Sequence, residues 1–274
     1  MVVPDSISYR PSLVSFLDIL GFRELLASAS ADDVAKHLLE LKRATQPIDQ
    51  GAPDDTLASE PKWFQVSDAI VRIRHFDTQY KDGALYYELS DLGLAQASLA
   101  GQGVFIRGGL AIGDAAVGTD EIPLAFGPAV ADAYELEAKL AVYPRIVISQ
   151  KVIDQYRSGT ELKAQQHSSE YDEKAVLPMI RSSSTGPWLD YMSTAEASGI
   201  EFSTYLGFCN RHKEQLARCL SEFASDPRKM EKYLWLASYH NCHVRESIVL
   251  RDSWYPEEDL IIEKPFGWDF PSKL

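Results

Sequence analysis

The sequence predicts an α+β fold in which helices cover one face of a mostly antiparallel sheet. Short apolar segments alternate with helix-like segments over residues 13–149, and two apolar runs within residues 63–76 are joined by a tight turn. The chain has 274 residues, of which 45% are hydrophobic, so it is long enough to bury a sizeable core. We find no internal repeat and no low-complexity segment.

The elements of the first part are expected in the order strand, helix, strand, strand, helix, strand, helix and strand. Gly21 ends the first strand, and Ser67 and Asp68 suit a hairpin turn because their side chains bond nearby backbone N–H groups. Gly108 and Gly109 interrupt a strand, which is typical of a bulge or a close backbone approach. The expected segments are a strand at 13–20, a helix from 22 to 41, a loop at 47–61, a hairpin at 63–76, a helix at 84–99, a strand at 104–112, a helix from 127 to about 142 and a strand at 145–149.

The last third of the chain changes character and is mainly helical. Two long helical patterns are separated by Asp226 and Pro227. We therefore expect one domain over residues 1–192 and a helical extension over 193–274 that packs on it. The segments are a hydrophilic stretch at 158–174, a hairpin at 175–191, helices at 202–223 and 229–250, and a tail at 254–274 that covers the surface.

The charge and cysteine content exclude several classes of function. Lys and Arg number 27 against 40 Asp and Glu, a net charge of −13, which disfavours binding to nucleic acid or to anionic membranes. Three cysteines without a CxxC pair suit a reducing compartment. The N-terminus lacks a signal-peptide pattern and no apolar run is long enough to span a bilayer, so we expect a cytoplasmic protein.

Two aspartates carry the chemical information. Asp18 lies at the end of an apolar strand and Asp68 at the apex of an apolar hairpin, where an isolated carboxylate is costly to desolvate. If the two elements are neighbours in the sheet, both carboxylates project from one edge, and a hard divalent cation between them offsets their repulsion. The alternative is that Asp18 caps the next helix and Asp68 only forms a turn.

Four motifs occur in an order that carries a resemblance. They are FLDILGF at 16–22, FQVSDAIV at 64–71, RGGLAIG at 107–113 and FGPAVADAYELEAKLAVYPRIVIS at 126–149. This set resembles class III nucleotide cyclases, and more closely the stand-alone pyrimidine cyclases of bacterial antiphage (Pycsar) defence. The resemblance covers residues 12–150, about half the chain.

The resemblance implies a ferredoxin-like catalytic domain and a homodimer with active sites across its interface. Two Mn²⁺ or Mg²⁺ ions per site would be held by Asp18, Asp68 and the backbone carbonyl of Ile19. The 3′-hydroxyl of a nucleoside triphosphate would attack its own α-phosphate, giving a 3′,5′-cyclic nucleotide and diphosphate, so the enzyme would be a phosphorus–oxygen lyase. The pyrimidine branch implies UTP as substrate and cyclic UMP as a second messenger for a downstream effector in antiphage defence. CTP is the alternative.

The same resemblance suggests residues that contact the nucleotide. Phe16, Gly21 and Phe22 belong to a loop whose backbone N–H groups would face the phosphates, and Gly21 permits a close approach. Phe64 or Tyr134 would fill the space that a small pyrimidine leaves. The alternative is that both aromatic rings belong to the core, and this alternative is favoured for Phe64. The base-recognition positions of purine cyclases fall near Leu124 and near Lys62 or Phe64, and they do not separate UTP from CTP.

One departure from the purine cyclases concerns the interface helix. Ala131 and Glu135 stand where many purine cyclases carry an Asn and an Arg. Other cations would then replace that Arg, and Arg107 is the first choice because it lies in an apolar strand beside Gly-Gly. An ion pair between Arg107 and a helix carboxylate is the alternative. Further candidates are Arg145, Lys139 and Arg181.

Three other functions stay open. The missing Asn and Arg also fit a catalytically inactive, nucleotide-sensing dimer, and the same aspartates could serve a metal-dependent phosphohydrolase. Glu135, Glu137 and Lys139 would pair across a dimer axis. Cys209, His212, His240, Cys242 and His243 match no zinc pattern well, and we expect the histidines to pack and hydrogen-bond between helices.

Overall fold

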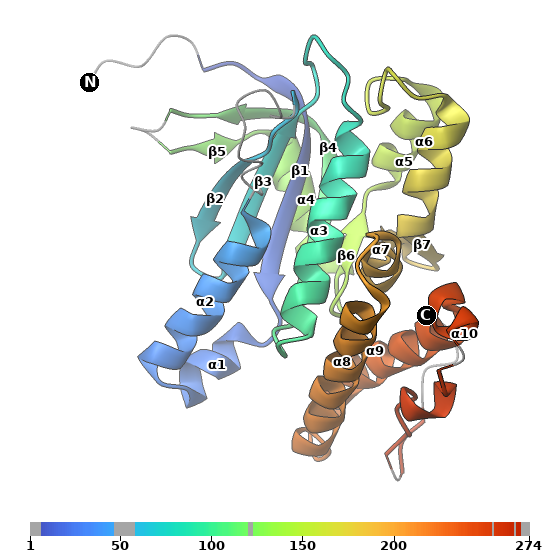
Figure 1. Cartoon of the computed structure of the whole chain (residues 1–274). Helices are drawn as coiled ribbons and strands as arrows, with labels where there is room; N and C mark the ends of the chain where they lie inside the picture. The colour runs from blue at the N-terminus through green and yellow to red at the C-terminus, as the bar shows by residue number, and fades with distance from the viewer. Residues whose placement is uncertain (1–6, 47–57, 120–122, 254, 266, 270–274) are drawn as a thin grey trace.

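The computed structural model in Figure 1 describes residues 7–46, 58–119, 123–253, 255–265 and 267–269. The strands form one mixed sheet in the order β2-β3-β1-β4-β6-β8-β7, with β5 paired to β4. Among the described strands, β4 and β6 are parallel and the other pairs are antiparallel. The strands are β1 (Arg10–Ile19), β2 (Lys62–Val66), β3 (Ala69–His75), β4 (Ile106–Val117), β5 (Ala125–Phe126), β6 (Ile146–Ile148), β7 (Ile180–Ser183) and β8 (Gly186–Leu189).

The helices lie on both faces of this sheet. Figure 1 shows α2 and α3 in front of the strands and α4 behind them. The helices are α1 (Phe22–Ser28), α2 (Ala31–Thr45), α3 (Ala84–Ala100), α4 (Pro128–Leu140), α5 (Gln150–Ser158), α6 (Ser169–Val176), α7 (Tyr191–Ala197), α8 (Phe202–Glu222), α9 (Pro227–Glu246) and α10 (Ile248–Asp252), with short 3₁₀ turns at Leu177–Met179 and Glu257–Asp259.

The α+β class is confirmed, and the first part has a ferredoxin-like arrangement. The chain runs β1, α1–α2, β2, β3, α3, β4, and β1 lies between β3 and β4 in the sheet. This is the βαββαβ succession of that fold. The prediction that helices cover one face is wrong because the central strands are apolar on both faces, and α4 covers the second face.

Alternation along β1 divides the core into two layers. Leu13 and Leu17 face α2 and α3, whereas Val14 belongs to a cluster with Ala129 and Ala133 of α4. The α4 helix approaches β4 closely, since a Cβ on Gly109 would lie 2.3 Å from the carbonyl oxygen of Ala133. The glycine pair in β4 therefore marks a close backbone approach, one of the two predicted possibilities.

A buried charge network joins α3 to β1 and β3. Arg72 and Arg74 of β3 both donate to Glu88 of α3, at 3.1 Å and 2.9 Å, and both reach Asp91. Ser15 of β1 donates to Glu88 at 2.7 Å. Burial raises the pKa of Glu88, but the two guanidinium groups outweigh it and lower the pKa to about 2. The network fixes the two strands that carry the candidate site against one helix.

Several predicted boundaries differ from the structure. The helix expected at 22–41 is two helices, because Ser30 caps the second one by accepting from the backbone N–H of Asp33. The hydrophilic stretch contains α6, and the second hairpin begins only at β7, after a 3₁₀ turn. The strand expected at 104–112 extends to Val117. Residues 47–57 of the expected loop and residues 254, 266 and 270–274 of the expected tail lie outside the described residues.

The helices α7, α8 and α9 enclose a second core against the sheet. Trp188 of β8 packs edge-on against Trp235 of α9 at 5.3 Å, and Phe105 packs against Tyr233 at 5.8 Å. The histidines hydrogen-bond between helices as expected, since the Nδ1 atoms of His212 and His240 lie 2.9 Å apart.

The predicted domain boundary falls inside α7, and a division at 192/193 stays a prediction. None of the described helices combines the length and the apolar character needed to cross a bilayer.

Candidate functional site

A groove of about 1240 Å³ opens at the end of β1, between α1 and the adjoining ends of α8 and α9. Figure 1 shows α1 on one side of the end of β1 and α8 on the other. The groove brings together most of the predicted site residues and leaves out Phe64. Those that line it are Phe16, Asp18, Ile19, Gly21, Phe22, Asp68, Arg107 and Tyr134.

The two predicted carboxylates meet in this groove. Asp18 comes from β1, and Asp68 from the turn between β2 and β3, where Ser67 adopts a left-handed conformation with φ 58°. Strand β3 pairs directly with β1, so the turn is carried to the end of β1. Burial, a hydrogen bond to Asp68 and the charge of Asp68 raise the pKa of Asp18 to about 7, against the opposing effect of Arg107.

The alternative role for Asp18 is wrong. The residue before α1 is Gly21, and no side chain caps that helix. Asp68 does lie in the predicted tight turn, but its carboxyl group also contacts Asp18. Two carboxyl groups that share a hydrogen bond in a partly buried position provide hard oxygen donors for Mg²⁺ or Mn²⁺.

Asp18 and Asp68 supply the carboxylates that would hold divalent ions, and Ile19 lies in the same groove lining. Within the described part of the chain, no group of three or more His, Cys, Asp and Glu side chains is arranged to bind a metal. The donor set here is smaller, a pair of carboxylates and a backbone oxygen, so any bound ion keeps open positions for phosphate oxygens and water.

Arg107 joins the carboxylate pair to α4. One guanidinium nitrogen lies 3.1 Å from Asp18 and 2.7 Å from Glu137, and another donates to the carbonyl of Ala141 at 3.5 Å. Asp18 and Arg107 are direct partners in the register of β1 and β4, so both side chains leave the sheet on the same face. The ion pair with a helix carboxylate, which the sequence left open for Arg107, is present.

Glu137 is the site residue that the sequence analysis assigned elsewhere. We expected it to pair across a dimer axis, but it is buried and pairs with Arg107 within the chain. Burial raises its pKa, and the nearby Asp68 adds to the effect while Arg107 opposes it. Ala129, Ala133 and Glu137 follow one another at intervals of four residues in α4, which places Glu137 on the helix face that packs on the sheet. That spacing could have identified it.

The loop after β1 borders the groove as expected. Gly21 has φ 80°, which favours glycine, and its carbonyl accepts from the first turn of α1. Leu20 donates its backbone N–H to the carbonyl of Phe105 at 2.8 Å, so the loop is tied to the segment before β4. The side chain of Phe22 is buried in the core, so its backbone is the part available to a ligand.

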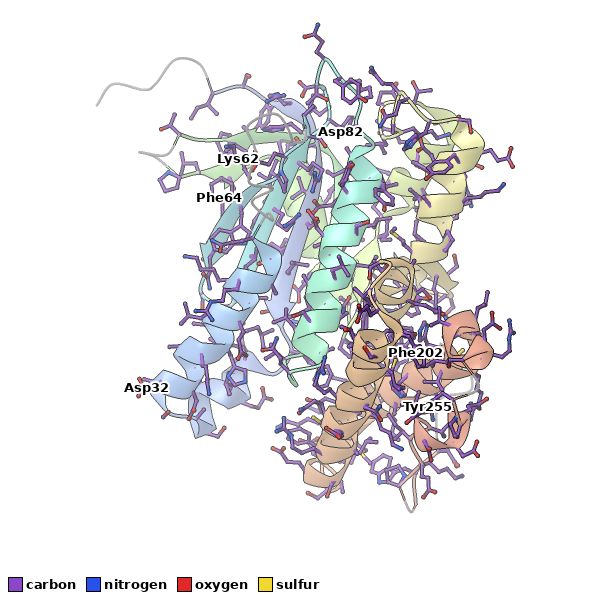
Figure 2. The ribbon with its side chains drawn as sticks, in the orientation of Figure 1. Asp32, Lys62, Phe64, Asp82, Phe202 and Tyr255 are labelled. Atoms are coloured by element: carbon purple, nitrogen blue, oxygen red, sulfur yellow. The ribbon has the colours of Figure 1, made fainter. Side chains whose placement is uncertain are left out.

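The aromatic side chains proposed for base recognition are placed differently from one another. Tyr134 is 54% exposed and lies edge-on to Phe16 at 5.3 Å, on the groove wall. Phe64 packs against the α4 side of the sheet, which agrees with the core alternative. Figure 2 shows Lys62 and Phe64 on the edge strand β2, away from α8 and α9. Leu124 is exposed before β5 and is not part of the groove lining.

Of the cations considered for the missing interface-helix Arg, only Arg107 borders the groove. Arg145 is buried among the rings of Tyr143, Trp188 and Trp235. The other two are held in ion pairs outside the groove. They are Arg181, which pairs with Asp190 and Glu246, and Lys139, which pairs with Glu135 one helical turn away.

The opposite side of the groove comes from the C-terminal helices, and the sequence analysis did not foresee it. Arg218 of α8 and Lys229 and Lys232 of α9 line this side. These residues are some 200 positions from Asp18 and lie in no motif, so no local pattern joins them to the site.

Comparison with known proteins gives similarity at the level of solved structures. No protein-family model matches the chain, and neither does any curated protein sequence. The guanylyl cyclase Cya2 is 18% identical, with a TM-score of 0.41 over 55% of this chain and 80% of that chain.

Two further solved structures are similar to a comparable extent. The guanylyl cyclase domain of the RhoGC fusion protein from Blastocladiella emersonii is 16% identical, with a TM-score of 0.39 over 66% of this chain and 95% of that one. A class III adenylyl cyclase-like ATP-binding protein from Pseudomonas aeruginosa is 15% identical, with a TM-score of 0.40 over 61% of this chain and 40% of that one. Identities this low say nothing of activity.

Proposed function

We propose that this chain is a metal-dependent nucleotide cyclase that converts a pyrimidine nucleoside triphosphate, with UTP as the first choice, to its 3′,5′-cyclic monophosphate. The observation that carries the proposal is the meeting of the Asp18 and Asp68 carboxyl groups in one groove. Both belong to the motifs on which the resemblance to class III cyclases rests. CTP is the alternative substrate.

In the proposed reaction the O3′ atom of the ribose bonds to the α-phosphorus. The bond from that phosphorus to the bridging oxygen breaks, diphosphate leaves with the electron pair, and the hydroxyl proton passes to solvent. Divalent ions supply a lowered pKa for the hydroxyl and charge neutralisation for the phosphates. The reaction needs no covalent nucleophile, so most of the catalysis is positioning and charge stabilisation.

The groove residues have separate tasks in this reaction. Asp18 and Asp68 would hold the ions as carboxylates, which requires that Asp18, whose pKa is raised by burial and by Asp68, lose its proton. Arg107 fixes the position of Asp18 through the ion pair at 3.1 Å, and Glu137 fixes Arg107 from the other side. Gly21 allows the loop backbone to approach the phosphates.

We also propose a homodimer, with the face around α4 as the contact surface. Apolar and aromatic side chains are exposed there, among them Tyr134 on α4, and Val66 at the end of β2, which is 69% exposed. In the cell, the cyclic nucleotide would act as a second messenger in the cytoplasm and would be read by a downstream effector in antiphage defence. These cellular roles rest on the motif resemblance alone.

The test is to incubate the purified protein with each of the four ribonucleoside triphosphates and Mn²⁺ and to identify the products by mass spectrometry. We expect cyclic UMP or cyclic CMP from the parental protein and none from Asp68→Ala. Asp114→Ala removes an exposed carboxylate on β4 and should leave the rate unchanged. If Asp68→Ala converts UTP at the parental rate, the metal assignment is wrong.

The same assay separates the alternatives. A nucleotide-sensing protein without activity is favoured by one observation, that the guanidinium of Arg107 is already engaged by Asp18 and Glu137. That function predicts nucleotide binding without any product. A linear monophosphate as product would identify a phosphohydrolase instead.

A further inference from the structure

The C-terminal helices place a basic surface on the groove, opposite the loop that follows β1. We call it the basic wall, and it consists of Arg218 on α8 and Lys229 and Lys232 on α9. The whole chain carries 27 basic against 40 acidic residues, so a cluster of cations on one side of one groove runs against the overall charge. Glu222 is the acidic residue that lines the same side.

A short path of contacts and neighbouring residues connects the basic wall to the carboxylate pair. The guanidinium of Arg218 covers Gly103, where an added Cβ would lie 2.8 Å from Nη2. Two residues further on, the carbonyl of Phe105 accepts from Leu20, which is itself two residues after Asp18. Both ends of this path border the same groove.

The basic wall also faces α1. Lys229 Nζ lies 4.0 Å from Glu24 in the first turn of α1 and 3.9 Å from Asp226. Its ammonium group lies 4.9 Å from the centre of the Phe223 ring. The groove therefore has the glycine loop and α1, which carries Arg23, on one side and the three cations of the basic wall on the other.

The position of the basic wall is fixed by contacts between the helices and the sheet. Phe223 and Tyr233 stack with ring centres 5.3 Å apart, which joins the end of α8 to α9. Tyr233 packs against Phe105, and Glu231 accepts a hydrogen bond from Tyr143 at 3.2 Å. The backbone positions of the cations are thus held by a packed scaffold, so a ligand does not need to order α8 and α9 when it binds.

Two of the three cations are available to a ligand. Within the described residues, neither Arg218 nor Lys232 has a carboxylate within 4.0 Å, and the contacts of Lys229 are at the limit of that distance. Arg218 is exposed and Lys232 is half-buried. Guanidinium and ammonium groups without carboxylate partners are the side chains that proteins use for phosphate oxygens.

We propose that the basic wall binds the terminal phosphates of the triphosphate and the diphosphate that leaves, so that α8 and α9 form part of the active site. This inference rests on the proposed function, because it places the α-phosphate at the carboxylate pair and the polyphosphate chain across the groove. The negative charge on the leaving diphosphate is then neutralised by the side chains of the basic wall, which lie outside the ferredoxin-like part.

The experiment is calorimetric titration of inorganic tripolyphosphate, in excess Mg²⁺, into the parental protein and two double variants. Arg218→Ala/Lys232→Ala removes two wall cations. Arg211→Ala/Arg228→Ala removes the same charge from exposed positions on the same two helices, outside the groove. Circular dichroism and the urea midpoint confirm that both variants are folded.

We expect the affinity for tripolyphosphate to fall at least about tenfold in the wall variant and to stay unchanged in the control variant. Equal affinity in the two variants, an equal loss in both, or no binding by the parental protein overturns the inference. Tripolyphosphate has no ribose and is not cyclised, so this result is independent of the four-nucleotide assay. A loss confined to the wall variant, without any cyclic product from the parental protein, would reject the cyclase and retain the polyphosphate site.

Discussion

The raised pKa of Asp18, which comes first from burial and then from the neighbouring Asp68, predicts how the metal-free protein responds to pH. The folded chain holds a proton on Asp18 up to a pKa of about 7, whereas the unfolded chain releases it near the ordinary value of 3.8. Because the folded state then binds more protons than the unfolded state, the free energy of unfolding falls as the pH rises between these two values. Asp18→Asn removes the group that titrates and should abolish this part of the fall.

The size of the effect follows from the two pKa values. A shift of the Asp18 pKa from 3.8 to about 7 corresponds to a change of at most about 4 kcal/mol in the free energy of unfolding. The side chain of Asp18 is 20% exposed, so water screens its repulsion from Asp68. The part of the effect that belongs to the range between pH 3.8 and pH 5 is already complete at pH 5 and is not measured. We therefore expect the parental protein to lose about 1–2 kcal/mol more than Asp18→Asn between pH 5 and pH 8.

The assay is urea unfolding of both proteins in EDTA at pH 5, 6, 7 and 8. Asp114→Asn, which neutralises an exposed carboxylate on the neighbouring strand, is the matched control and should follow the parental curve. If the parental protein and Asp18→Asn respond to pH identically, then the pKa of Asp18 is not raised, and the burial of its carboxyl group beside Asp68 is refuted. A saturating Mn²⁺ concentration should reverse the parental loss, because the ion favours the ionised pair.

Two further predictions concern the parts of the fold that hold the site. Glu88→Gln should lower the free energy of unfolding at pH 7 by about 3–5 kcal/mol, measured by urea unfolding, because it leaves Arg72 and Arg74 without their buried carboxylate. The stabilisation by Glu88 is present above its ordinary pKa and is lost as the pH falls towards about 2. Gly109→Ala should destabilise the protein by about 1–3 kcal/mol and lower the rate of the proposed cyclisation, because the new Cβ would push α4 off the sheet at Ala133. Unchanged unfolding midpoints would contradict either argument.

The carboxylate pair was predictable because charge in an apolar strand has few explanations. Asp18 interrupts the run at 13–20, and Asp68 lies at the apex of the hairpin that pairs beside it. The close backbone approach at the glycine pair was predictable in the same way, since Gly109 has no room for a Cβ. In each case the residue type conflicts with its local pattern, and the conflict marks a tertiary contact.

The second face of the sheet was harder to predict, because the periodicity of a short strand cannot show whether one face or both are covered. Val14 and Leu17 point to opposite faces of β1, and both are fully buried. Both faces are apolar there because α4 packs on the one and α3 on the other. A pattern of small residues in α4, with Ala129 and Ala133 four apart, was the available indication.

The basic wall could not be predicted from local patterns at all. Arg218 and Lys232 lie on amphipathic helices where a cation ordinarily faces solvent, and nothing in their neighbours distinguishes them from Arg211 or Arg228. What distinguishes them is the packing of Tyr233 on Phe105, a contact between positions more than 100 residues apart. The position of these cations depends on contacts between residues far apart in the sequence, so it can be determined only from the folded structure.

The charge distribution also bears on why the interface helix can lack an Arg. In a chain of net charge −13, a polyphosphate ligand is repelled unless cations gather locally. Arg107 is already engaged by two carboxylates, so it serves better to orient Asp18 than to neutralise a leaving group. Among the described groove residues, Arg218 on α8, Lys232 on α9 and Arg23 on α1 have no carboxylate within 4.0 Å. If the proposed cyclase reaction takes place here, the charge that purine cyclases place on the interface helix has moved to the C-terminal helices, and the extension is then a catalytic element.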